Sequence, residues 1–399
     1  MRLSDRINNL SESQTIAMAK KSRELKAQGV DIISLSLGEP DFTTPTFIKE
    51  AAKQAIDNDF SYYAPVPGYA DLREAIVKKL KRDNNLTYHA DQIVVSTGAK
   101  QSIINAIMCL INPGDEVLIP APYWVSYVAM VELAGGKPVI IPTSVEHDFK
   151  LSPEQLEKAI TPKSKLILYS SPCNPSGSIY AYEELSALAE VIKRHDDLFV
   201  ISDEIYELIT YNGKVASIAS VDGMKDRTAI INGLSKGFAM TGWRLGYMAA
   251  PKPLASACDK MQGQFTSATS SITQRAAITA MDADPGALEY MRSAFERRRN
   301  LVINGLKTIP GLKVNEPQGA FYAFPDVSAY FGKAINGNRI NDANDLSLYL
   351  LEKANVSTVT GDAFGSPNCI RLSYATSEEI LTVALERLSA AFNALWNGE

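Results

Sequence analysis

Residues that build metal centres and disulfide frameworks are scarce in this sequence. Its 399 residues include four cysteines and three histidines. The cysteines lack the paired spacing of zinc sites and disulfide-rich domains, and the histidines stand apart in polar surroundings. We therefore expect neither a metal site nor a disulfide framework. The residues concerned are Cys109, Cys173, Cys258, Cys369, His89, His147 and His195.

Long apolar runs are also missing. No segment has the continuous hydrophobic length that a membrane-crossing helix needs. The first residues, MRLSDRINNLSESQ, lack the apolar core of a secretory signal. The formal net charge of −5 gives no electrostatic reason to expect binding to nucleic acid or to an anionic membrane. We expect a cytoplasmic protein with small-molecule ligands.

Two common nucleotide-binding motifs are absent as well. No GxGxxG sequence follows a predicted strand, and the sequence GxxxxGK[ST] does not occur. These glycine-rich loops bind the phosphates of dinucleotides and nucleoside triphosphates. Their absence disfavours both classes of ligand.

From about residue 90 onward, short apolar runs alternate with longer amphipathic stretches. The runs are almost continuously apolar, which is typical of parallel strands covered by helices on both faces. After about residue 305 this alternation is lost. We predict an α/β fold, with a large domain on a mostly parallel sheet flanked by helices and a smaller α+β domain. The predicted bounds are 1–46 for an N-terminal arm and part of the small domain, 47–305 for the large cofactor-binding domain and 306–399 for the small C-terminal domain.

Polar and aromatic residues follow the predicted strands, at the edge of the sheet where ligands bind in open α/β folds. Lys236 follows the run TAIINGL, and Asp203 lies at the end of the run LFVISDE, three residues before Tyr206. We expect these residues to line one pocket. The full set is Thr97, Gly98, Ala99, Lys100, Pro122, Tyr123, Trp124, Asn174, Asp203, Tyr206, Ser235 and Lys236.

Each residue alone also has a simpler explanation. Asp203 is placed to cap a helix, and Trp124 and Tyr206 fit a hydrophobic core. Arg244 fits a solvent-exposed charge, and Asn174, which precedes a proline, fits a turn. All of these explanations would have to hold at once for the pocket to be absent.

Taken together, the residues match the needs of a phosphorylated pyridine aldehyde. The Lys236 amine can bind the aldehyde, and the Asp203 carboxylate can keep the ring nitrogen protonated. Asn174 and Tyr206 can donate hydrogen bonds to the phenolic oxygen, and Trp124 can stack on the ring.

The phosphate of such a ligand needs hydrogen-bond donors at the start of a helix. Gly98 and Ala99 open the predicted helix KQSIINAIM and offer backbone amides. Ser235 adds a hydroxyl, and Arg244 adds a guanidinium whose fork geometry suits phosphate. We expect these four residues to bind the phosphate.

The short motifs that span nearly the whole chain are SLGEPDF, YAPVPGYADLREAI, APYWVSY, NPSG, SDEIY, SKGFAMTGWRLGY and IRLSYA. In this order they resemble the fold-type I, class I aminotransferases, which use pyridoxal 5'-phosphate. The similarity is closest to the bacterial and thermophile-type aspartate aminotransferases, a subgroup that includes prephenate aminotransferases. The resemblance implies catalytic roles for Lys236, Asp203 and Tyr206. It implies that Trp124 and Asn174 contact the substrate as well as the cofactor.

The same resemblance adds four site residues and gives a role to Lys100. Arg371 in IRLSYA implies a clamp on the substrate α-carboxylate, a task suited to guanidinium, and Gly38 implies a backbone contact to that substrate. The resemblance assigns binding of the distal substrate carboxylate to Lys100. It assigns a further substrate contact to Thr15, in the N-terminal arm. Tyr63 in SYYAPVPG implies a contact with the phosphate in the other subunit, and therefore a homodimer with shared active sites.

The implied reaction moves an amino group between aspartate and 2-oxoglutarate through a pyridoxal-phosphate Schiff base. A prephenate, or dual aspartate and prephenate, aminotransferase is the first alternative. More remote alternatives are an aromatic or alanine aminotransferase, a non-transaminating lyase of the same fold, and a cofactor-binding regulator without turnover. The sequence departs from the animal-type enzymes at Gly233, where those enzymes have a serine that binds phosphate.

Overall fold

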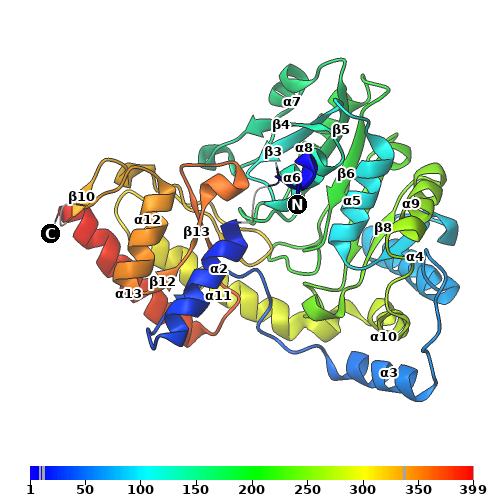
Figure 1. Ribbon diagram of the computed structural model, residues 1–399, viewed down its shortest axis with the longest axis horizontal. Helices are drawn as coiled ribbons and strands as arrows, with labels where there is room; N and C mark the ends of the chain where they lie inside the picture. The colour runs from blue at the N-terminus through cyan, green and yellow to red at the C-terminus, as the bar shows by residue number, and fades with distance from the viewer. Residues whose placement is uncertain (9, 11–13, 336–337, 399) are drawn as a thin grey trace.

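The computed structural model describes residues 1–398 apart from 9, 11–13 and 336–337. Its main element is a seven-stranded sheet with the order β2-β8-β7-β6-β5-β3-β4, which lies in the right half of Figure 1. Its strands are β2 (Ile93–Ser96), β3 (Glu116–Ala121), β4 (Lys137–Pro142), β5 (Ser164–Ser170), β6 (Phe199–Asp203), β7 (Thr228–Gly233) and β8 (Gly246–Ala249).

The sheet is mostly parallel, which confirms the predicted fold class. Strands β3 to β7 run in one direction, whereas β8 is antiparallel to both of its neighbours, β7 and β2. The sequence analysis did not predict β8, because its four residues form a run too short to stand out. Since β8 alone is reversed, the carboxyl ends of all the other strands meet at one edge of the sheet.

Helices cover both faces of this sheet, so alternate residues of one strand pack against different helices. In β7, Ile230 belongs to the hydrophobic cluster that includes residues of α3, α4 and α10, whereas Ile231 belongs to the cluster that includes residues of α5 and α9. Val95 and Val94 of β2 divide in the same way. Two buried faces explain why the strands read as continuous apolar runs.

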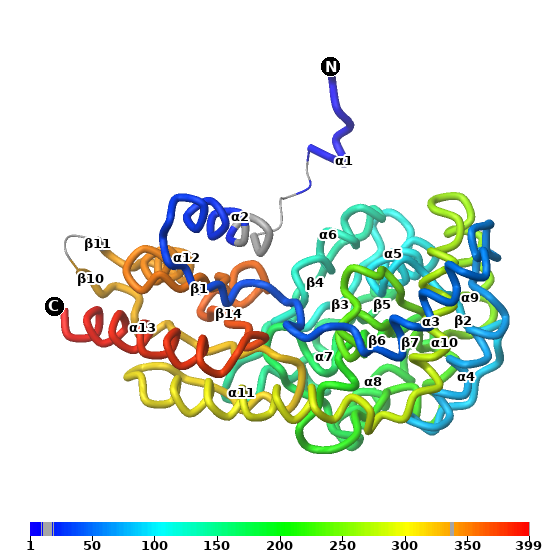
Figure 2. Tube along the Cα trace, turned by 90° about the horizontal axis from the view of Figure 1, so that it is seen from below, coloured from blue at the N-terminus to red at the C-terminus, as the bar shows by residue number. Residues whose placement is uncertain are grey.

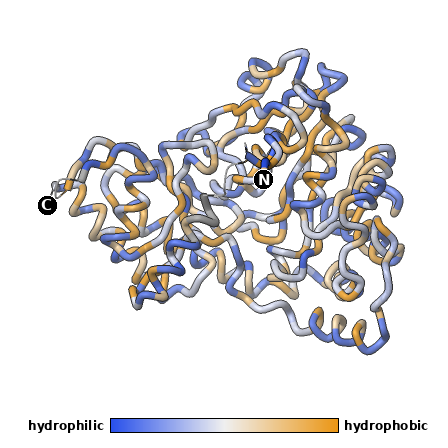
Figure 3. Tube along the Cα trace, in the orientation of Figure 1, coloured by the Kyte–Doolittle hydropathy of each residue, from blue (hydrophilic) through white to orange (hydrophobic). Residues whose placement is uncertain are grey.

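The helices are amphipathic where they lie on the surface. In Figure 3, α3 at the lower edge shows both hydrophilic and hydrophobic residues, and its buried residues are Ile48, Ala52 and Ala55. Among the described residues, no helix combines the length and the apolar character needed to cross a membrane. The helices are α1 (Asp5–Asn8), α2 (Gln14–Ala27), α3 (Thr46–Asp57), α4 (Ala70–Asn84), α5 (Ala99–Leu110), α6 (Ser126–Leu133), α7 (Pro153–Ala159), α8 (Tyr182–Ile192), α9 (Lys252–Phe265), α10 (Ser271–Asp282), α11 (Glu289–Lys307), α12 (Ala343–Tyr349) and α13 (Glu378–Asn397).

A second, smaller region mixes strands and helices. Its three-stranded antiparallel sheet has the order β13-β14-β9, and β1 near the N-terminus pairs in parallel with β12. Figure 2 shows α11 running along the molecule from the large sheet to this smaller region. The exact domain bounds given above stay a prediction. The small strands are β1 (Ile33–Ser34), β9 (Tyr322–Ala323), β10 (Ala334–Ile335), β11 (Asn338–Arg339), β12 (Val356–Ser357), β13 (Val359–Thr360) and β14 (Ile370–Ser373).

Candidate functional site

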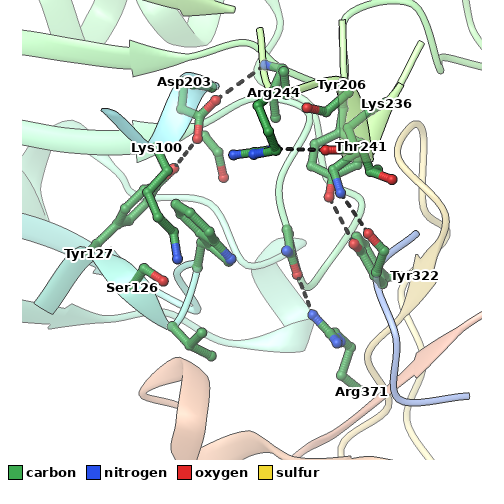
Figure 4. A pocket seen from close by; sticks show the side chains of 18 residues that line it. Lys100, Ser126, Tyr127, Asp203, Tyr206, Lys236, Thr241, Arg244, Tyr322 and Arg371 are labelled. Atoms are coloured by element: carbon green, nitrogen blue, oxygen red, sulfur yellow. Dashed lines mark hydrogen bonds between the residues drawn. The ribbon is translucent and has the colours of Figure 1, made fainter. Parts of the chain in front are cut away.

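A cavity of about 280 Å³ lies at the carboxyl ends of the parallel strands, where the large sheet meets residues of the small region. This is the position predicted for ligands of an open α/β sheet. Figure 4 shows side chains from both regions pointing into it. Its lining residues are Gly38, Ala99, Lys100, Trp124, Val125, Ser126, Tyr127, Ser170, Asn174, Asp203, Ile205, Tyr206, Ser235, Lys236, Thr241, Arg244, Tyr322 and Arg371.

Lys236 enters the cavity from the turn that follows β7. The Met240 amide donates to the Ser235 carbonyl across this turn, which holds the lysine at the mouth of the strand. Its Nζ atom donates to the Gly38 backbone oxygen at 2.6 Å. Burial and, to a lesser extent, the positive charge of Arg371 lower the pKa of Lys236 to about 8. A substantial fraction of the amine is therefore neutral, and nucleophilic, near neutral pH.

Asp203 is the last residue of β6 and is buried. The Tyr127 hydroxyl donates to its Oδ2 atom at 2.7 Å, and the Ile205 amide donates to Oδ1 at 3.2 Å. Burial raises the pKa of Asp203 to about 6, despite these two hydrogen bonds. A positive group beside the Asp203 carboxylate would offset most of the free-energy cost of burying its negative charge.

Tyr127 was not predicted as a site residue, although it holds Asp203. It lies in α6, three residues after Trp124, and the two rings pack edge to face with centroids 5.6 Å apart. A spacing of three places both rings on one side of a helical turn. The spacing of these two aromatic residues in the motif PYWVSY could therefore have indicated that Tyr127 lies near the site.

Two tyrosines meet on the other side of Lys236. The hydroxyl oxygens of Tyr206 and Tyr322 are 2.8 Å apart, and both side chains are buried. Gly38 packs so closely here that an added Cβ would overlap the Tyr322 hydroxyl, which explains the glycine. The sequence analysis predicted Tyr206 and Gly38 but missed Tyr322, because β9 is far away in the chain.

Arg371 lies in β14 and reaches the cavity from below in Figure 4. Its Nη1 donates to Asn174 Oδ1 at 3.0 Å, and its Nη2 donates to the Ser36 carbonyl at 2.6 Å. Its Nε is buried without a hydrogen-bond partner among the described residues. Burial lowers the pKa of this guanidinium. An unpartnered buried donor of this kind favours binding of an anion.

The N-terminus of α5 forms the predicted phosphate cradle. Gly98 is the N-cap residue of this helix and has a φ of 88°. The backbone nitrogen of the next residue, Ala99, lies against Gly246, so a Cβ atom added to Gly246 would overlap that nitrogen. The Arg244 guanidinium lies beside Gly98 and donates to the Thr241 carbonyl at 2.8 Å. Free amides and a cation at a helix start make a site for an anion. Neither Gly246 nor Thr241 was predicted.

Lys100 lies in the first turn of α5, next to the aromatic wall of the cavity. Its Nζ atom is 4.8 Å from the centre of the Trp124 ring. Burial lowers the pKa of Lys100, and the nearby Arg244 lowers it further. Ser126, which was not predicted, lines the same end of the cavity.

Four residues expected in this pocket are absent from its lining, namely Thr97, Gly98, Pro122 and Tyr123. Two other predicted residues, Tyr63 and Thr15, are not placed in it either. Tyr63 lies in the loop between α3 and α4 with 98% of its surface exposed, so it does not reach the site of its own chain. Thr15 falls in α2, but its side chain lies outside the part of the chain that the structure describes. The predicted roles of both residues stay predictions.

The arrangement fits pyridoxal phosphate, the cofactor expected from the sequence. An amine, a buried carboxylate that needs a positive partner, and a helix N-terminus with an arginine surround one cavity. Ser170 also lines the cavity, and its hydroxyl is buried without a partner among the described residues. Lys236, Asp203 and the cradle at Gly98 and Ala99 are the groups placed to hold the aldehyde, the ring nitrogen and the phosphate.

Comparisons with known proteins support this reading. The family model for aminotransferase class I and II matches residues 30–388. The bifunctional aspartate aminotransferase and glutamate/aspartate-prephenate aminotransferase of Petunia hybrida is 49% identical over 98% of this chain and 82% of its own.

Solved structures agree with the same assignment. The aspartate aminotransferase from Rhizobium meliloti superposes with a TM-score of 0.96 and is 42% identical, covering 98% of this chain and 99% of its own. The aspartate aminotransferase from Thermus thermophilus with maleate has a TM-score of 0.92 and 40% identity, covering 98% of this chain and 100% of its own. A match over most of the chain, together with this identity, shows that the protein belongs to the class I and II aminotransferase family.

Proposed function

We propose that this protein transfers amino groups between aspartate and 2-oxoglutarate. The observation that carries the proposal is the pair of cations in one cavity, Arg371 and Lys100. An amino acid with a second carboxylate needs one cation at each end, whereas alanine or phenylalanine needs only one. The names of the Rhizobium meliloti and Thermus thermophilus relatives, both aspartate aminotransferases, support the assignment.

Pyridoxal phosphate, the cofactor of this family, supplies an aldehyde for the amino group and a ring that draws electrons from the substrate Cα. Lys236 is the residue that would hold the aldehyde. Its pKa is lowered to about 8, so its Nζ atom, when free, could accept a proton from the substrate Cα and return it.

Asp203 and the two tyrosines prepare the site for this proton transfer. A negative Asp203 would keep a proton on the ring nitrogen, and Tyr127 holds the carboxylate in position. Tyr206 could donate its single hydroxyl hydrogen to the phenolic oxygen, because Tyr322 can then donate to Tyr206. Asn174 is held by Arg371 and can serve the same oxygen.

A variant of Lys100 tests the proposed preference for dicarboxylic substrates. We expect Lys100→Met, which keeps the aliphatic stem over Trp124, to weaken transition-state binding of aspartate and glutamate by about 2–5 kcal/mol. The physical reason is that a partly desolvated distal carboxylate loses the counter-charge that Lys100 provides. The measurement is kcat/KM for aspartate, glutamate, alanine and phenylalanine.

Alanine and phenylalanine are the internal controls for this variant, because neither has a distal carboxylate. Their kcat/KM values should change little. An equal loss for all four substrates would mean that Lys100 only stabilises the start of α5, and the dicarboxylate preference would need another cation.

Prephenate is the second candidate substrate. A lysine is a flexible point charge and not a planar fork, so it can follow a carboxylate held at more than one distance. The Petunia hybrida relative carries prephenate aminotransferase in its name. A panel of oxo acids, read by loss of the amine form of the cofactor, separates prephenate from 2-oxoglutarate, and it also exposes an aromatic, alanine or non-transaminating activity.

We also propose a homodimer whose two active sites are shared. Tyr62 and Tyr63 stand side by side with 83% and 98% of their surfaces exposed, which is unusual for neighbouring aromatics. A two-fold interface would bury both and would place each Tyr63 at the phosphate of the partner's site. The four free cysteines support a reducing, cytoplasmic location, which cell fractionation can test.

Removing one hydroxyl tests the shared site. We expect Tyr63→Phe to weaken pyridoxal-phosphate binding about tenfold, because one hydrogen bond to a charged phosphate is lost. Tyr182→Phe is the matched control, since Tyr182 is also an exposed tyrosine, at the start of α8. Sedimentation at assay concentration measures the assembly. A fully active monomer would exclude the dimer proposal.

A further inference from the structure

Gln262 is a fully buried residue in the last turns of α9. Its Nε2 atom donates to two backbone oxygens, those of Val66 at 2.8 Å and Val95 at 2.9 Å. Its Oε1 atom accepts from Asn105 Nδ2 at 3.2 Å. An amide whose two donors and one acceptor all have hydrogen-bond partners is held in one orientation.

The three partners of Gln262 belong to three segments that matter for the proposed site. Val66 lies in the loop that carries Tyr63. Val95 lies in β2, just ahead of the turn that leads to Gly98. Asn105 lies in α5, the helix whose N-terminus forms the cradle. One side chain therefore connects the exposed tyrosine loop to the anion-binding end of the sheet.

Other hydrogen bonds also hold the tyrosine loop. The Pro67 carbonyl accepts from the Val95 amide of β2 at 3.0 Å. Gln274 Oε1 accepts from the Tyr69 amide at 2.9 Å, and Ser271 Oγ donates to the Phe60 carbonyl at 2.5 Å. Between these anchors the loop extends into solvent with Tyr63. A loop held in this way presents its side chains in a defined position, which lowers the entropy lost on binding.

We propose that Gln262 is a positioning residue for two active sites at once. Through Val95 it fixes the phosphate-binding turn of its own subunit. Through Val66 it fixes the Tyr63 loop that serves the partner's site, so this part rests on the shared homodimer proposed above. Loss of the amide leaves the buried Val95 carbonyl and the partly buried Val66 carbonyl without this donor, and both backbone segments must then shift to regain hydrogen bonds.

Mixed dimers separate the two effects. One subunit carries Lys236→Ala and a purification tag, so only its partner has a lysine that can bind the cofactor. Gln262→Met in the tagged subunit reaches the working site through the Tyr63 loop. In the working subunit it reaches that site through Val95 and Asn105. We expect a loss of cofactor affinity of about tenfold from either placement. The readout is a titration of apo dimers with pyridoxal phosphate, followed by the absorbance of the lysine-bound cofactor.

Gln274→Met is the matched control, because Gln274 is equally buried and holds the same loop through Tyr69. It has no hydrogen bond to β2 or α5 among the described residues, so it should act only from the tagged subunit. If Gln262→Met gives no folded dimer, Gln262→Glu, which keeps an acceptor for Asn105, is measured instead.

Tyr63→Phe in the tagged subunit tests the shared site itself. If it leaves the working site unchanged, the shared dimer fails. If it weakens the working site while the Gln262 variant in the same subunit does not, the dimer stands and the positioning role of Gln262 is overturned.

Discussion

A Lys236→Ala variant will lose turnover by several orders of magnitude while it keeps its fold. The variant removes the only amine placed both to bind the cofactor aldehyde and to move the Cα proton. No other amine among the lining residues can replace it, since Lys100 lies at the opposite, aromatic end of the cavity. The measurements are kcat with aspartate and 2-oxoglutarate, and circular dichroism for the fold.

The pH dependence of cofactor capture gives an independent check on Lys236. The pKa of this amine is lowered to about 8, chiefly by burial. The neutral amine is the nucleophile, so the rate at which the apo protein takes up pyridoxal phosphate should rise with pH up to about 8 and level off above it. Lys236→Ala should show no such rise. Substantial turnover in a variant free of wild-type protein would refute the role of Lys236.

Much of the site was predictable because it lies at the ends of buried strands. A strand with both faces covered must read as a continuous apolar run, so the first polar residue after it is easy to identify. Asp203 at the end of β6, and Ser235 with Lys236 shortly after β7, were found in this way. Parallel pairing then brings these ends to one edge, and the structure places both residues in one cavity.

The missed residues depend on contacts between segments that are far apart in the chain. Tyr322 reaches the cavity from β9, 116 positions away from its partner Tyr206. Gly246 matters only because β8 inserts beside β2 and brings it against the Ala99 amide. Local sequence patterns carry no information about such pairings, and a strand as short as β8 gives almost no signal of its own.

The second large effect concerns Asp203. We expect Asp203→Asn to cost about 2–5 kcal/mol of cofactor binding, because the protonated ring nitrogen loses its buried counter-charge. Turnover should fall as well, since an unprotonated ring draws electrons from the Cα less strongly. Tyr127→Phe is the matched control: it removes one hydrogen bond to Oδ2 but keeps the charge, and its loss should be smaller. Cofactor titration and kcat measure both variants.

The apo protein should respond to Asp203→Asn in the opposite direction. Burial raises the pKa of Asp203 from 3.8 to about 6, so between about pH 4 and pH 6 the unfolded chain releases this proton while the folded chain retains it. The free energy of unfolding therefore falls with rising pH across that window, by about 3 kcal/mol for this one group.

Asparagine does not titrate and can keep both hydrogen bonds, because the Tyr127 hydroxyl can accept as well as donate. Thermal unfolding of the two apo proteins should give similar stabilities at pH 4 and a more stable variant at pH 7. A variant that is less stable at both pH values, with cofactor affinity unchanged, would show that Asp203 is a structural cap and not the partner of the ring nitrogen.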